Sequence, residues 1–176
     1  MPPAEFLRLL RAAFVYTCAQ RGFPMDAGND RFIPEFGVRV FLVEDNPEHA
    51  FIAVTVIRQL LGEASEVIVA ENADEAVGLI SQFTDNDRPD LMLVDLRLPD
   101  NGGFSVLSAA RASESCAQVP AFVITSSLYD QDIAQSYELG ASAVLCKPLS
   151  RASLREELIR IGKLPPTGSA GATKTH

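Results

Sequence analysis

The chain has 176 residues, of which 47% are hydrophobic and 22% charged, as expected for one well-buried folded domain with a further element. Its formal net charge of −8 has the wrong sign for a surface that binds phosphate backbones, which argues against direct nucleic-acid binding. The three cysteines form no Cys-x-x-Cys pair, so neither a disulfide framework nor a zinc knuckle is indicated. No apolar run approaches the roughly 18 residues of a membrane helix. We therefore expect a cytoplasmic protein that does not contact membranes.

Five short apolar runs without polar alternation follow one another along most of the chain, and such runs are typical of strands covered on both faces of a parallel sheet. They are residues 38–43, 66–70, 90–96, 121–124 and 142–146. Amphipathic segments lie between them. We expect helices from Asn46-Pro47 to about Gly62, from Asn72 onward, and over residues 103–113, 130–139 and 151–161.

This alternation of five strands and five helices predicts a doubly wound α/β fold, (βα)5, with a five-stranded parallel sheet. We assign it to residues 37–164. Residues 165–176 are rich in Pro, Gly, Thr and Ser and are expected to form a flexible tail.

Residues 1–36 hold an expected extra helix, about 4–20, and a linker rich in Gly, Pro, Asp and Asn. The helix is apolar over most of its circumference, so it needs burial against more than one surface. Packing onto its own domain, a dimer arm and a docking surface for a kinase all remain open. We favour a homodimer, because a symmetric second copy is the commonest way to cover such a surface.

Polar side chains come directly after four of the predicted strands. The first strand ends in Glu44 and Asp45, the third in Asp95, the fourth in Thr125 and the fifth in Lys147. In a doubly wound sheet these ends converge at one edge, where the ligand site lies. Clustered carboxylates imply a cation such as Mg²⁺, while a hydroxyl and an ammonium suit a transferring phosphoryl group. The chemistry suggested is phosphorylation of a carboxylate.

The same positions carry a family resemblance. The fragments Glu44-Asp45, Val94-Asp95-Leu96, Leu98-Pro99, Ile124-Thr125-Ser126 and Lys147-Pro148 resemble, in this order and spacing, the receiver domain of two-component response regulators. Thr125 lies 30 residues and Lys147 lies 52 residues after Asp95. The resemblance covers about residues 37–163 and implies a flavodoxin-like fold.

The resemblance implies a role for each matching residue. Asp95 would be the phosphoacceptor. Asp45, Glu44 and Asp95 would bind Mg²⁺, with the backbone carbonyl of Arg97 as a further ligand. Thr125 would be the switch hydroxyl.

For the fifth strand, the resemblance implies that Lys147 pairs with a phosphoryl oxygen and that a cis peptide joins it to Pro148. Three residues before the lysine the family commonly has an aromatic ring, where this chain has Val144. His49 is a lone histidine, to which we assign no role.

The leading interpretation is a phosphorylation switch that receives its phosphoryl group from a histidine kinase or a histidine phosphotransfer protein. Beyond Lys163 there is no room for an output domain, so we expect the protein to signal by contact with an unidentified downstream protein. We expect no enzymatic activity other than its own phosphorylation and dephosphorylation. A phosphorylation-independent interaction module stays open because of Val144. A third hypothesis, a Mg²⁺-dependent phosphatase or phosphotransferase, has less support, because Arg97 occupies the position where that class of enzyme usually has a second acid.

Overall fold

The computed structural model describes residues 38–99, 102–126 and 129–164. Strands and helices alternate in this part of the chain, as predicted. The strands are β1 (Arg39–Val43), β2 (Glu66–Ala70), β3 (Leu91–Asp95), β4 (Ala121–Thr125) and β5 (Ala143–Cys146). The helices are α2 (Pro47–Leu61), α3 (Ala73–Gln82), α4 (Gly102–Ala112), α5 (Asp130–Glu138) and α6 (Arg151–Arg160). The helix expected near residues 4–20 and the tail expected at 165–176 lie outside the described residues.

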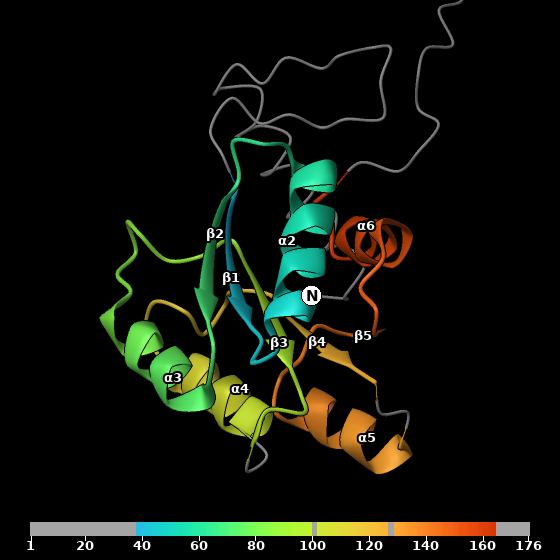
Figure 1. Cartoon of the computed structure of the whole chain (residues 1–176). Coiled ribbons are helices and arrows are strands. Elements are labelled where there is room, and N and C mark those ends of the chain that lie inside the picture. Colours follow the sequence, from blue (N-terminus) through green and yellow to red (C-terminus); the bar gives the residue numbers. More distant parts are fainter. Residues whose placement is uncertain (1–37, 100–101, 127–128, 165–176) are drawn as a thin grey trace, which may run out of the picture.

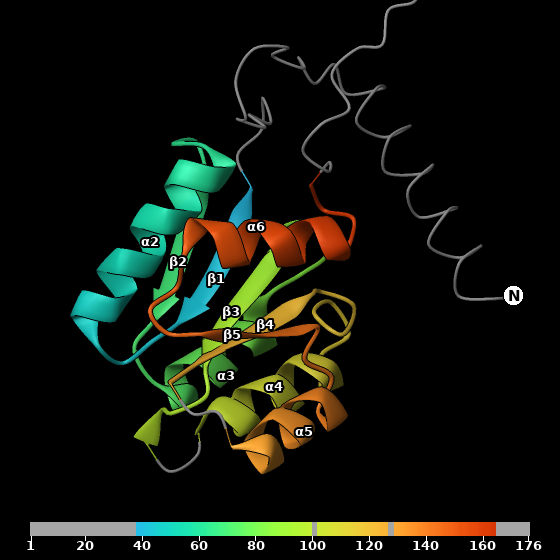
Figure 2. The same ribbon diagram turned by 90° about the vertical axis from the view of Figure 1, so that its right-hand side faces the viewer.

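All strands pair in parallel in one sheet of order β2-β1-β3-β4-β5. Helices α2 and α6 cover one face of the sheet, and α3, α4 and α5 cover the other (Figures 1 and 2). The predicted doubly wound five-stranded sheet is therefore confirmed. None of the helices among the described residues is both long and apolar enough to cross a membrane.

Each face of the sheet carries its own hydrophobic cluster, because alternate residues of a strand point to opposite faces. On one face, Leu42 and Leu93 pack with residues of α2 and α6, among them Ile57 and Leu154. The cluster on the other face unites strand residues with α3 and α4 and includes Phe41, Val43, Met92, Val94, Val123, Ile80 and Leu107. Strands β3 and β4 are buried along their whole length, which explains their continuous apolar sequence.

The start of α2 follows from its local sequence. The Asn46 side-chain oxygen accepts hydrogen bonds from the backbone N–H groups of Glu48 (2.9 Å) and His49 (3.1 Å), and Pro47 occupies the first turn. The helix ends at Leu61 and is followed by the C-cap residue Gly62, whose φ of 97° favours glycine. The Asn46 cap fixes the position of the first turn of α2 next to the end of β1.

The strand register brings the expected site together. Val43 pairs with Val94, so the next residues, Glu44 and Asp95, are neighbours across the β1–β3 pair. On the far side of β3, Asp95 pairs with Ile124, directly before Thr125. Chain order reverses between β1 and β3, the kind of position where doubly wound sheets bind ligands.

Helix α4 approaches the end of β3 closely at Gly103. A Cβ atom at this position would collide with the backbone of the phosphoacceptor candidate, Asp95, and would lie 2.7 Å from Cα and 2.8 Å from the carbonyl oxygen of Leu96. Strand backbone cannot move aside as a flexible side chain does, so only glycine allows α4 to pack here.

We predict that Gly103→Ala lowers the free energy of unfolding by about 3 kcal/mol, because it overpacks a backbone contact. Gly78→Ala is the matched control: Gly78 lies inside α3, and a Cβ there meets nothing within 4 Å. This control should raise the free energy of unfolding by about 0.5–1 kcal/mol. Urea denaturation measures both. Equal effects of the two substitutions would contradict the close approach.

Candidate functional site

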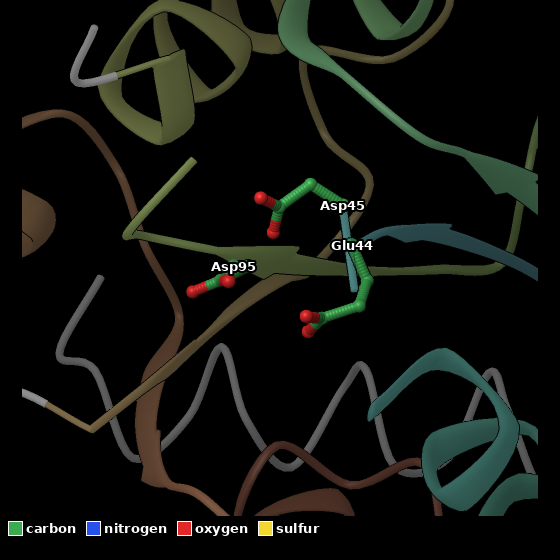
Figure 3. Close-up of side chains that lie close together, drawn as sticks. All are labelled: Glu44, Asp45 and Asp95. Carbon is green, nitrogen blue, oxygen red and sulfur yellow. The ribbon is translucent and has the colours of Figure 1, made fainter. Parts of the chain in front are cut away.

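Three carboxylates meet at the ends of β1 and β3 (Figure 3). Glu44 and Asp95 are each 3% exposed, whereas Asp45 is exposed. One oxygen from each carboxylate lies within 4.8 Å of the others. The structure thus brings together the three acidic residues that the sequence selected.

Lys147 joins the two buried carboxylates. Its Nζ atom donates to Asp95 Oδ2 at 2.7 Å and lies 2.8 Å and 2.7 Å from Glu44 Oε1 and Oε2. Burial alone would lower the pKa of Lys147, but the hydrogen bonds to Asp95 and Glu44 outweigh it and raise this pKa above its ordinary value. The ammonium is therefore charged at neutral pH. The peptide bond between Lys147 and Pro148 is cis, as expected.

The charges in this cluster do not balance. Three carboxylates face one ammonium, which leaves two negative charges in excess. Lys147 occupies the two buried carboxylates, so the outer Asp45 keeps an oxygen free of this lysine. Excess negative charge on hard oxygen atoms suits a divalent cation such as Mg²⁺, which binds through few protein oxygens and keeps several waters.

The second oxygen of Asp95 is held by the chain that follows it. Asp95 Oδ1 accepts a hydrogen bond from the backbone N–H of Arg97 at 2.9 Å. Both oxygens of this carboxylate therefore have donors, Lys147 on one side and Arg97 on the other. Such preorganised donors can stabilise charge that develops on the carboxylate or on a group bound to it.

The Arg97 side chain leaves the cluster and reaches a different element. Its guanidinium contacts Asp132 Oδ2, in the first turn of α5, at 2.6 Å. The Arg97 side chain is 45% exposed and that of Asp132 is 21% exposed. This contact connects the loop after β3 to α5.

Thr125 is fully buried at the end of β4. Its backbone carbonyl accepts a hydrogen bond from the backbone N–H of Lys147 at 2.9 Å, so the two residues lie side by side at this edge of the sheet. Val144 pairs with Val123 and packs against the cluster under α3 and α4. The position where the family commonly has an aromatic ring is thus filled by a small aliphatic side chain.

One further residue, His49, belongs to the cluster, and no role could be assigned to it from the sequence. His49 Nδ1 lies 3.2 Å from Glu44 Oε1 and 3.2 Å from Lys147 Nζ. The available signal was its position: His49 is the third residue of a helix that starts directly after β1, with Asn46 as a recognisable cap. The cap predicts the first turn of α2, although no pattern in the sequence predicts which way the ring turns.

Comparisons with known proteins agree with this geometry. The family model for the response regulator receiver domain matches residues 40–159. The chain is 31% identical over 124 residues to the probable methanogenesis regulatory protein FilR2 of Methanothrix harundinacea, which covers 69% of this chain and 79% of that protein. It is 28% identical over 111 residues to the response regulator Rcp1 of Synechocystis sp., which covers 61% of this chain and 75% of Rcp1.

Solved structures show the same likeness. The bacteriophytochrome response regulator AtBRR is 30% identical, with a TM-score of 0.61 over 77% of this chain and 99% of that one. The receiver domain of the sensor histidine kinase PA1611 from Pseudomonas aeruginosa, solved with a magnesium ion in its active site cleft, is 30% identical, with a TM-score of 0.60 over 72% and 98% of the two chains. With its matched family model, fold and strand-end cluster, this chain belongs to the response regulator receiver domain family.

Proposed function

We propose that this chain is a phosphorylation-dependent signalling switch in which Asp95 accepts a phosphoryl group from a histidine kinase or a histidine phosphotransfer protein. The observation that carries the proposal is the setting of Asp95: a buried carboxylate with Lys147 at one oxygen and the Arg97 N–H at the other. Two further acids, Glu44 and Asp45, stand beside it.

The proposed reaction moves one phosphoryl group. A carboxylate oxygen of Asp95 forms a bond to phosphorus, while the bond from phosphorus to the donor's imidazole nitrogen breaks and that nitrogen regains a proton. Lys147 transfers a hydrogen bond from Asp95 to a phosphoryl oxygen. Asp45, Asp95 and Glu44, with the carbonyl of Arg97, would hold Mg²⁺, which when bound neutralises charge on the transferring group.

The output proposed for the switch is a contact with a downstream protein. Thr125 would respond to the phosphoryl group through its hydroxyl, while Val144 offers no ring that could rotate. Residues 1–36, for which the sequence favours self-association, are proposed to form a homodimer. Sedimentation of the full chain beside a chain that begins at Phe36 tests this: loss of the dimer in the shorter chain is expected, and a monomeric full chain would contradict it.

Two alternatives remain distinguishable from this proposal. A phosphorylation-independent interaction module would keep the fold but take no label. A Mg²⁺-dependent phosphatase or phosphotransferase would turn over an external phosphate ester through Asp95. The place of a second acid is taken by Arg97, whose guanidinium pairs with Asp132, and this observation favours the switch.

We predict that Asp95→Asn abolishes labelling by acetyl phosphate and Mg²⁺, because the amide keeps the side-chain shape but removes the nucleophile. Mass spectrometry should locate the label in the parent chain at residue 95, as a hydroxylamine-sensitive acyl phosphate. Asp74→Asn, at an exposed aspartate in the first turn of α3, is the control and should leave labelling unchanged. Full labelling of Asp95→Asn would contradict the assignment of Asp95 as the phosphoacceptor.

For the cation site, we predict that Asp45→Asn has opposite effects with and without metal. In EDTA it should raise the free energy of unfolding by about 0.5–1 kcal/mol, since it removes a carboxylate that no lysine offsets and that water partly screens. With millimolar Mg²⁺ the parent chain should become the more stable one, because a ligand of the folded state adds stability. Thermal denaturation under both conditions checks this. The idea fails if the order does not change with Mg²⁺.

We further predict that phosphorylation perturbs the first turn of α5 through Arg97. A phosphoryl group adds about −1.5 to −2 charges close to this side chain and competes with Asp132 for the guanidinium. Backbone amide shifts of α5 should change on phosphorylation, and Arg97→Met should at least halve the change while Asp95 remains labelled. Equal shifts in the two proteins would exclude this route.

A further inference from the structure

We propose that His49 is a positioning residue for the phosphorylation reaction, whose ring nitrogen Nδ1 holds the ion pair of Lys147 and Glu44 in place beside Asp95. The inference rests on the function proposed above and adds a residue to its site.

The contacts around the ammonium carry the inference. A lysine ammonium has three hydrogens to donate and no capacity to accept. Around Lys147 Nζ lie Asp95 Oδ2 at 2.7 Å, the Glu44 carboxylate at 2.7–2.8 Å and His49 Nδ1 at 3.2 Å. His49 Nδ1 also lies 3.2 Å from Glu44 Oε1. As an acceptor Nδ1 bonds to the Lys147 ammonium, and as an N–H donor it bonds to the Glu44 carboxylate, so in either tautomer it holds one member of this ion pair.

The three partners are not equivalent during the reaction. Asp95 changes most, because one of its oxygens becomes bonded to phosphorus. Glu44 also belongs to the acidic group that would hold a cation, so its carboxylate would interact with both the Lys147 ammonium and the cation. His49 neither reacts nor competes for the cation through a carboxylate. It is therefore the member of this group that stays the same before and after transfer.

A neighbour that stays in place next to Nζ matters because the side chain of Lys147 is flexible. Four rotatable bonds give a lysine side chain much conformational freedom, and each hydrogen bond to a fixed partner reduces it. Lys147 reaches the site from β5 with a side chain 12% exposed. Holding Nζ in place beforehand lowers the cost of aligning it with the phosphoryl oxygens.

The fold fixes His49 from outside the cluster. Its backbone N–H donates to the Asn46 side chain at 3.1 Å, within the capped first turn of α2. The His49 side chain is 49% exposed, so it contributes little to the hydrophobic core. A substitution there tests the contact with Lys147 with little disturbance of packing.

The test compares two substitutions of the same residue. His49→Asn keeps a polar group, because the asparagine amide can accept from Lys147 or donate to Glu44, whereas His49→Leu removes it. Phe51→Ala is the control, because this side chain lies in the same helix but is 73% exposed. Acetyl phosphate serves as the donor, so that docking of a protein donor on α2 does not enter the rate.

Two measurements decide the outcome. The first is the rate constant for labelling at saturating acetyl phosphate and Mg²⁺. The second is the ¹⁵N-detected NMR signal of the Lys147 ammonium. The sequence has only three lysines, so few such signals have to be distinguished. We expect His49→Leu to lower the rate constant about fivefold to tenfold, which corresponds to the loss of one hydrogen bond. We also expect this substitution to broaden the ammonium signal. His49→Asn should stay within about twofold of the parent and keep the signal, and Phe51→Ala should match the parent.

The inference is overturned if His49→Leu labels as fast as the parent, or if His49→Asn is as impaired as His49→Leu. A merely structural role would lower thermal stability without changing the ammonium signal, and that result also counts against it. If the parent chain itself takes no label at Asp95, the proposed function fails and this inference fails with it. A labelled parent with an unaffected His49→Leu variant overturns the role of His49 alone.

Discussion

The arrangement of this receiver domain depends on one ammonium group that lies between two buried carboxylates. Burying a carboxylate costs several kcal/mol unless it is paired, and the register of β1 and β3 places Glu44 and Asp95 next to each other. Lys147 offsets both, yet it comes from β5, which is separated from β3 by β4. The side chain must therefore reach across the end of β4, and the site exists only when the sheet is complete out to its edge strand.

Much of this arrangement could be predicted from the sequence. Strands buried on both faces leave continuous apolar runs, and Asn46 and Asn72 mark helix starts that the structure confirms through their side-chain hydrogen bonds. The members of the site could be predicted as well. The carboxyl ends of parallel strands lie at one edge of the sheet, so the polar residues that directly follow them come together there. Position along a strand was sufficient for Glu44 and Asp95.

The partners of the long side chains could not be predicted in this way. Arg97 pairs with Asp132, 35 residues away, and His49 contacts Lys147, 98 residues away. Strand order brings such residues near each other, but rotamers decide which atoms meet, and these depend on packing from several elements at once. At the level of sequence, the family resemblance therefore implied only the backbone carbonyl of Arg97 as a metal ligand, and His49 was assigned no role.

The difference between buried and partly exposed ion pairs bears on how the proposed phosphorylation of Asp95 would reach the surface. Val144 has no ring to rotate, so under this proposal the polar contacts of the site would carry the change. Lys147 is held between buried carboxylates and has little freedom to leave. Arg97 and Asp132 form a partly exposed pair, of a kind worth about 0–1 kcal/mol. A dianionic phosphoryl group on Asp95, if the proposed function holds, would displace a partner held so weakly at little cost, and α5 is the helix that this pair connects to the loop after β3.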